Sequence, residues 1–276
     1  MKKVWIMVLA LCLLFVSAQA QEEKLPEGIV KIEAAGAQVD LDGDGVTEQV
    51  SLTMPEDEYG CGEFTVTVNG KTATEYGECL RGDMYALTMG YRTYLLVSED
   101  GPSDDPYSHF FAYDGESVKG IGGVPAYPER MELGLSGITA MVRGSVLQTW
   151  YRPGDFIVAT GGAWDENYET YTAFGPRVVE VPRSVYPMGT VAMVKKGLTL
   201  QVSPTDDRQA LRLKEGTRCV IAATDDVEWL YIVNDDEANE TDQYIGGWIR
   251  IDGFSIVTDE GTSDAWDVFD GLSFAD

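Results

Sequence analysis

The sequence has few basic residues and a single histidine. Its 276 residues include 20 lysines and arginines against 46 aspartates and glutamates, which gives a formal net charge of −26. Phosphate backbones and anionic membranes repel such a chain, so nucleic acid is excluded as a partner. The remaining partner classes are cations, neutral glycans and basic protein surfaces. We expect the one histidine, His109, to be an ordinary strand residue rather than a member of a catalytic triad.

Signatures of common catalytic devices are absent as well. The sequence has no Gly-x-Ser-x-Gly, no His-Glu-x-x-His, no Cys-x-x-Cys and no phosphate-cradling glycine loop. These absences favour a non-catalytic protein. The alternative is an exported glycan-active hydrolase with paired carboxylates in the first domain, beside aromatic platforms that stack on sugars. The residues concerned, which are otherwise ordinary core or surface residues, are Trp150, Tyr151, Asp155, Trp164, Asp165, Glu166 and Tyr168.

Long apolar runs are lacking except at the N-terminus. Lys2 and Lys3 precede an apolar run over residues 4–16, and Ala18-Gln19-Ala20 is a small-x-small cleavage pattern. The run is short for a membrane span. We therefore predict a signal peptide over residues 1–20 and a chain in the bacterial cell envelope or secreted, with no stable membrane insertion after cleavage. The alternative is that the segment is retained as an anchor.

Cysteine is scarce, with four in all and three beyond residue 20. Export permits disulfides. Cys61 and Cys79 flank one hairpin-like segment and form the natural pair, whose closure would contribute roughly 3 kcal/mol. Cys219 lies in an apolar strand and is expected to be a buried free thiol. The alternative is that all three thiols are reduced.

A helical hydrophobic stripe is missing before residue 260, and short strands separated by glycine turns take its place. Asn69-Gly70, for example, is the signal of a type I′ hairpin turn. The pattern predicts an all-β sandwich, barrel or propeller-like stack over residues 21–182. Residues 183–256 hold about six short strands, which suits a small barrel. Residues 257–276 are expected to form an acidic tail with a short helix that presents Trp266, Phe269 and Leu272 on one face.

The chemically most specific stretch is the segment 40–48, here called the aspartate loop. Calcium prefers six to eight oxygen ligands. Position twelve of an EF-hand would carry glutamate, but here it is Ser51 within a strand, so we expect a structural calcium site rather than a helix–loop–helix site. The alternative is an acidic turn without metal. The predicted ligands are the side chains of Asp40, Asp42, Asp44 and Glu48 and the carbonyl of Val46.

A second acidic segment follows at Glu99, Asp104 and Asp105. Its carboxylates either form another cation site or make a solvated run of charge. The sequence leaves both interpretations open.

The aspartate loop resembles the calcium loop of FG-GAP/VCBS repeats. The matching residues are Asp40, Asp42, Asp44, Gly45 and Glu48, and the strand that follows also fits. The segments 99–105 and 113–115 resemble later blade segments of bacterial proteins of this type. The resemblance implies a propeller-like or partial-propeller β domain with structural calcium.

Residues 190–252 resemble a bacterial SH3 (SH3b) domain. The matching segments are 198–204, 213–217, 228–232 and 247–250, and the family's usual arginine in the first is replaced by Gln201. The resemblance implies a module that binds cell-wall peptide or another ligand. Trp229, Tyr231 and Trp248 would line its groove, or else they form its core. The sequence thus predicts a calcium-stabilised β scaffold that carries an SH3-like module for a cell-wall peptide, a glycan or a basic protein.

Overall fold

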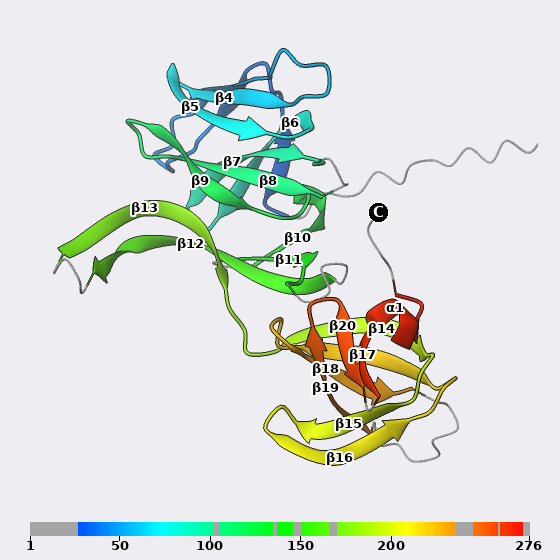
Figure 1. Ribbon diagram of the computed structural model, residues 1–276. Coiled ribbons are helices and arrows are strands. Elements are labelled where there is room, and N and C mark those ends of the chain that lie inside the picture. Colours follow the sequence, from blue (N-terminus) through cyan, green and yellow to red (C-terminus); the bar gives the residue numbers. More distant parts are fainter. Residues whose placement is uncertain are drawn as a thin grey trace, which may run out of the picture.

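The computed structural model describes residues 27–101, 105–134, 137–145, 151–165, 170–235, 245–258 and 260–272, without the side chains of 162–174. Antiparallel sheets account for most of these residues (Figure 1), so the all-β prediction is confirmed. The predicted signal peptide lies outside the described residues. No helix in the described ranges is long and apolar enough to cross a membrane.

The first half of the chain forms three sheets in succession, here called the first, middle and third sheets. Their strand orders are β2-β3-β4-β5, β1-β6-β7-β8-β9 and β10-β11-β12-β13. The first sheet contains β2 (Ala37–Val39), β3 (Glu48–Thr53), β4 (Gly62–Val68) and β5 (Lys71–Gly77). The middle sheet contains β1 (Ile29–Ile32), β6 (Leu80–Met89), β7 (Arg92–Glu99), β8 (Tyr107–Tyr113) and β9 (Val118–Val124). The third sheet follows the 3₁₀ turn η1 (Pro128–Arg130) and contains β10 (Met131–Leu133), β11 (Ile138–Arg143), β12 (Tyr151–Asp165) and β13 (Thr170–Val181).

The middle sheet is buried on both faces, which explains the short continuous apolar runs of its strands. Along β7, Leu95 and Val97 pack in a cluster with the first sheet, whereas Tyr94 and Leu96 pack in a cluster with the third sheet. Alternate residues of a strand point to opposite faces, so the run serves two cores. The three sheets are therefore stacked as layers, in chain order from top to bottom of Figure 1.

The hairpin of β12 and β13 is longer than the rest of its sheet. β11 pairs with β12 only between Tyr151 and Phe156, while the pairing with β13 extends to Asp165. The outer half of this hairpin therefore has a ladder on one side only, and it curves away from the stack in Figure 1.

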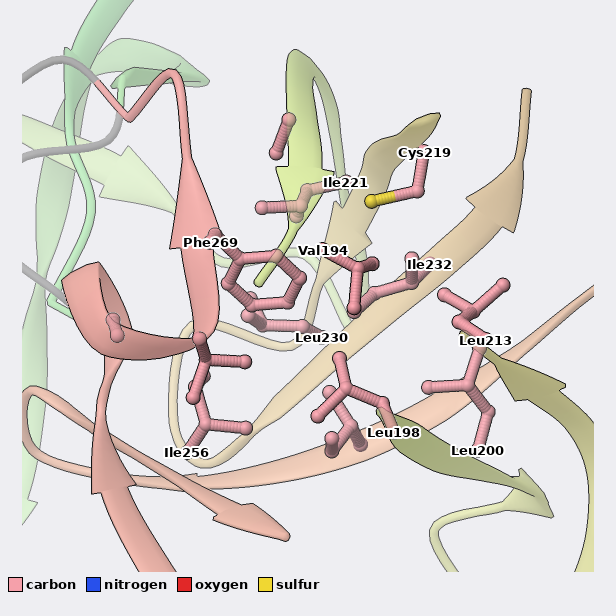
Figure 2. Close-up of a cluster of buried hydrophobic side chains, with 14 of the residues drawn as sticks. Val194, Leu198, Leu200, Leu213, Cys219, Ile221, Leu230, Ile232, Ile256 and Phe269 are labelled. Atoms are coloured by element: carbon pink, nitrogen blue, oxygen red, sulfur yellow. The ribbon is translucent and has the colours of Figure 1, made fainter. Parts of the chain in front are cut away.

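The second half of the chain forms a strongly bent sheet of the order β16-β15-β19-β18-β17-β14-β22. Its strands enclose one apolar cluster that contains Val194, Leu213, Cys219, Ile232 and Phe269 (Figure 2). Among the described residues no ladder joins β16 to β22, so the sheet is not a closed barrel. Its elements are β14 (Tyr186–Val194), β15 (Leu198–Ser203), β16 (Asp206–Leu213), β17 (Arg218–Thr224), β18 (Trp229–Asn234), β19 (Gly246–Asp252), β20 (Ser255–Thr258), β21 (Gly261–Asp264), α1 (Ala265–Val268) and β22 (Phe269–Asp270).

The last segment differs from the predicted tail. Val268 and Phe269 are buried in the cluster of the bent sheet, and β22 pairs with β14. The single helical turn does not present the predicted face, because Trp266 is 42% exposed and Phe269 belongs to a strand. The segment is part of the second core rather than an appendage on it.

An ion pair joins the two halves. Arg152 of β12 donates from Nε to Asp226 Oδ2 at 2.8 Å and from Nη1 to Glu180 Oε1 at 2.6 Å. Its guanidinium also lies 3.9 Å from the ring centre of Tyr186 in β14. Asp226 belongs to the turn between β17 and β18 and also accepts a bond from the backbone N–H of Ser145. These contacts fix the bent sheet against the third sheet.

Candidate functional site

The aspartate loop connects β2 to β3 at one end of the first sheet. Its own carboxylates hold its shape: Asp40 accepts bonds from the N–H groups of Gly43 and Gly45, at 2.8 and 3.0 Å. Both glycines have positive φ, 83° and 87°, a conformation that side chains with a Cβ adopt at a cost. The aspartate loop is therefore a tight turn that its own side chains stabilise.

Asp40, Asp42 and Glu48 converge within this loop. Each offers a carboxylate oxygen within 4.8 Å of the oxygens of the other two. Glu48 is 4% exposed, and its Oε2 accepts a bond from the N–H of Leu41 at 2.9 Å. Three carboxylates in such proximity repel one another unless a cation or protons compensate their charge. The sequence prediction named these three residues as metal ligands.

One predicted carboxylate ligand, Asp44, falls outside the convergent set. Asp44 is exposed, and its Oδ1 accepts a bond from the N–H of Val46 at 2.7 Å. That bond stabilises the turn without bringing the Asp44 carboxylate into the group of three. Val46 was predicted to offer its backbone carbonyl, and that ligand stays a prediction. The sequence predicted that Asp40, Asp42 and Asp44 all act as metal ligands. In the folded turn, the carboxylate of Asp44 lies apart from those of Asp40 and Asp42.

The loop is also anchored to the middle sheet. Leu41 is buried in the core between the two sheets, and its carbonyl accepts a bond from the N–H of Thr93 at 3.2 Å. Gly115 lies in the turn between β8 and β9, next to Asp42. A Cβ added at Gly115 would lie 3.4 Å from Asp42 Oδ2. Asp42 therefore lies where the first sheet meets a hairpin of the middle sheet.

Trp229, Tyr231 and Trp248 lie on the outer face of the bent sheet. Trp229 and Tyr231 are two residues apart on β18, and Trp248 of β19 is the register partner of Tyr231. The intervening Leu230 and Ile232 point into the core. The rings of Tyr231 and Trp248 are 5.3 Å apart, and all three aromatic residues are partly exposed. The interpretation as core residues is wrong, since none belongs to the buried cluster.

Cys61 and Cys79 are adjacent, as their positions along the chain predicted. Their sulfur atoms are 3.9 Å apart, and both residues are partly exposed thiols. The hydrogen bond with Cys61 raises the pKa of Cys79. A disulfide between them stays a prediction. Cys219 is buried, as predicted, and burial raises its pKa to about 12.

The residues proposed for glycan hydrolysis are only partly described. Asp155 accepts bonds from Arg183 Nε at 2.6 Å and from Thr139 Oγ1 at 2.8 Å. The hydrogen bond from Arg183 holds the pKa of Asp155 below its usual range, which suits an ion-pair partner better than a general acid. The side chains of Trp150, Trp164, Asp165, Glu166 and Tyr168 lie outside the described residues.

Part of the second acidic segment is buried or ion-paired. The Glu99 side chain is 13% exposed, and Asp105 forms an ion pair with Arg143 at 2.7 Å. His109 is also largely buried, with Nε2 at 3.3 Å from Glu99 Oε2. The sequence did not predict that these residues meet, since Arg143 comes from another sheet. Asp104 lies outside the described residues.

The fold and the loop together define a layered antiparallel β protein with one convergent acidic loop. No family model, no curated protein and no solved structure matches the chain.

Proposed function

We propose that the protein is an exported, non-catalytic component of the bacterial cell envelope. Its first half is a calcium-stabilised β scaffold, and its second half is a module that binds a cell-wall peptide, a glycan or a basic protein. The observation that carries the proposal is the convergence of Asp40, Asp42 and Glu48 within 4.8 Å.

Calcium fits this group of residues by its chemistry. It is a hard cation that takes carboxylate, carbonyl and water oxygens in a flexible arrangement. Asp40, Asp42 and Glu48 would hold the ion, and its charge would offset the repulsion among them. Because Leu41 and Glu48 are buried in the scaffold, the ion would stabilise the junction between the first and middle sheets. An affinity of order 10⁻⁴ to 10⁻³ M is typical of such extracellular sites.

The layered half supports a partial-propeller arrangement. Three antiparallel sheets pack face to face through two separate cores, as neighbouring blades do. The bent sheet around a single core supports an SH3-like module, although its edge strands do not pair.

The binding surface of the module is the outer aromatic face. Partly exposed aromatic side chains supply large contact area at low entropic cost and are enriched at recognition sites. The pair of Tyr231 and Trp248, with Trp229 beside it, provides such a surface on two neighbouring strands. We propose that the ligand stacks there.

Calorimetric titration with calcium tests the scaffold. We expect binding heat with the unmodified chain, at least a tenfold loss of affinity in Asp42→Asn, and a change of less than threefold in Asp44→Asn. The second variant is the matched control, because Asp44 lies in the same loop but outside the group of three. Absence of heat from the unmodified chain would refute the calcium site, and equal losses in both variants would refute the assignment of ligands.

Sedimentation with purified cell-wall sacculi, with and without chelator, tests the module. We expect the unmodified chain to sediment with the sacculi and Trp248→Ala to remain in the supernatant. Tyr59→Ala is the control, because Tyr59 is a 70% exposed aromatic in the other half of the chain. Equal retention of Trp248→Ala and Tyr59→Ala would contradict the aromatic face as the binding surface.

A further inference from the structure

The outer aromatic face of the bent sheet continues into amide side chains. Tyr231 on β18 lies opposite Trp248 on β19. Trp248 in turn lies opposite Gln201 on β15, and Gln201 has Gln209 on β16 as its other register partner. Directly opposite residues of an antiparallel pair are neighbours on one face of the sheet. Two aromatic rings and a neutral amide group are therefore neighbours here, and all three side chains are partly exposed.

The two rings of this row lie along the surface of the sheet. Their centres are 5.3 Å apart, and their planes are tilted by 54°. A Cβ at Gly246 would lie 2.8 Å from the phenol end of Tyr231, so this glycine leaves the space that the phenol occupies. Leu230 and Ile232 fill the core from the opposite face. A ligand can therefore contact the two rings without any rearrangement of the core.

Charge is scarce on this part of the surface, although the chain carries a formal net charge of −26. No residue of β18 is charged, and the residues of β19 that pair with it include one charged residue, Arg250. The Nε of Arg250 donates to Glu228 Oε2 at 2.9 Å. A basic protein would meet no excess of negative charge on these two strands, and an ionised peptide would meet no unpaired counter-ion. The face suits an uncharged ligand.

Gln201 supplies polar groups that carry no charge. Its Nε2 donates to the carbonyl of Ser203 at 2.7 Å, which fixes the amide beside Trp248. A glutamine side chain has two N–H donors and a carbonyl oxygen, so one donor and the oxygen remain for a ligand. Ligand sites typically combine apolar and aromatic contacts with a few such polar groups, which fix the orientation of the ligand.

A sugar ring is complementary to this combination of groups. Its faces carry C–H groups, which stack on aromatic rings, and its edge carries hydroxyl or acetamido groups, which form hydrogen bonds with amides. We propose that the outer aromatic face binds an uncharged glycan chain, with sugar rings on Trp248 and Tyr231 and a hydrogen bond to Gln201. A glycan is one of the three ligand classes of the proposed function, on which the assignment of this face as the binding surface rests.

Calorimetric titration of the full chain with tetra-N-acetylchitotetraose and with cellotetraose tests this. We expect saturable binding of a tetrasaccharide, with an affinity that changes less than twofold between about 0.05 and 0.5 M salt, because salt screens only charged partners. Trp248→Ala should weaken binding at least tenfold. Phe254→Ala is the matched control, because Phe254 is a 43% exposed aromatic residue in the turn between β19 and β20, outside the face. It should change the affinity less than twofold.

A second variant keeps the test decisive if Trp248→Ala does not fold. Gln201 lies outside the buried cluster, so Gln201→Ala should fold, and it should weaken binding of the tetrasaccharide at least threefold. Equal affinities of Gln201→Ala, Trp248→Ala and Phe254→Ala would overturn the proposal. Absence of binding of both tetrasaccharides would overturn it as well.

Two further probes represent the other ligand classes. Peptides released from sacculi by an amidase represent the wall peptide, and tetra-lysine represents a basic protein. Tighter binding of either peptide probe than of the tetrasaccharides would overturn the glycan as the ligand. Sedimentation with sacculi separates this failure from that of the proposed function: retention on sacculi without tetrasaccharide binding overturns the glycan alone, whereas absence of both kinds of binding overturns the binding module too.

Discussion

Arg152 Nη2 lies 2.7 Å from Asp226 Oδ2, and both side chains are less than a tenth exposed. The two residues belong to different halves of the chain, so the ion pair is a buried contact between sheets that share no backbone ladder. Burial of two charges is tolerated only where their remaining donors and acceptors are satisfied. Glu180, Tyr186 and Ser145 meet this condition.

Removal of the Asp226 charge should therefore weaken the joint between the halves. Asp226 has φ 61°, and asparagine tolerates this conformation, so Asp226→Asn alters the charge with little backbone strain. We expect a loss of about 2 kcal/mol in the free energy of unfolding, because hydrogen bonds to charged groups contribute about 1.5–3 kcal/mol. Urea denaturation measures it. The surface pair of Asp206 and Arg208 is the control: Asp206→Asn should change the free energy of unfolding far less than Asp226→Asn does.

Glu48 should stabilise the scaffold even without calcium. It accepts the N–H of the buried Leu41, and Glu48→Ala leaves that donor unpaired, at a cost of about 1–3 kcal/mol. Glu48→Gln keeps an oxygen acceptor and should cost less than half as much in chelator. Thermal unfolding with and without calcium separates the two effects, because both variants should lose stabilisation by calcium. Equal destabilisation in chelator would show that charge, not the hydrogen bond, is what matters.

The three thiols should differ in reactivity. Oxidised glutathione should convert Cys61 and Cys79 to a disulfide with loss of two hydrogen atoms, the thiols being oxidised as glutathione is reduced. Closure of this loop should raise the free energy of unfolding by roughly 3 kcal/mol. Cys219 should stay unmodified in the folded chain, since burial raises its pKa to about 12. Peptide mass mapping distinguishes the bridge from separate glutathione adducts on Cys61 and Cys79, which would contradict it.

Acid should destabilise the fold through ion-paired carboxylates. The bond from Arg183 lowers the pKa of Asp155, and backbone bonds from Ser117 and Glu116 lower that of Asp114. Their folded-state pKa values lie below the unfolded ones. The stabilisation is therefore present above about pH 4 and is lost as the pH falls through the folded-state values. Urea denaturation between about pH 7 and pH 3 measures how the free energy of unfolding falls with pH. This fall should be smaller for Asp155→Asn than for the unmodified chain.

Local patterns predicted the local features well. Asn69 and Gly70 have φ 47° and 79°, as a type I′ turn requires, and the Asp-Gly repeat predicted the aspartate loop. The start of β6 has no clear strand pattern in the sequence, because Gly82, at φ 73°, lies where the register shifts. The apolar residues 84–87 are the part of the sequence that indicates this strand.

Features that depend on distant segments were not predictable in this way. Glu99 lines one cleft with Arg143 and Tyr151 from another sheet, and no sequence spacing encodes that meeting. Trp229 and Trp248 are large and apolar, so their residue type alone favoured a position in the core as much as one in a ligand groove. The strand register decides the face on which each lies, and register follows from pairing across the whole sheet.

The pairing of β1 with β6 has a consequence for the order of folding. Ile29 is opposite Leu87, so the whole of the first sheet is synthesised between the two partners. The meander of β2 to β5 has only local contacts and can form early, whereas β1 must wait for a distant edge. We expect β1 to pair with β6 late in folding. Its amides would then exchange with solvent before those of β3 and β4.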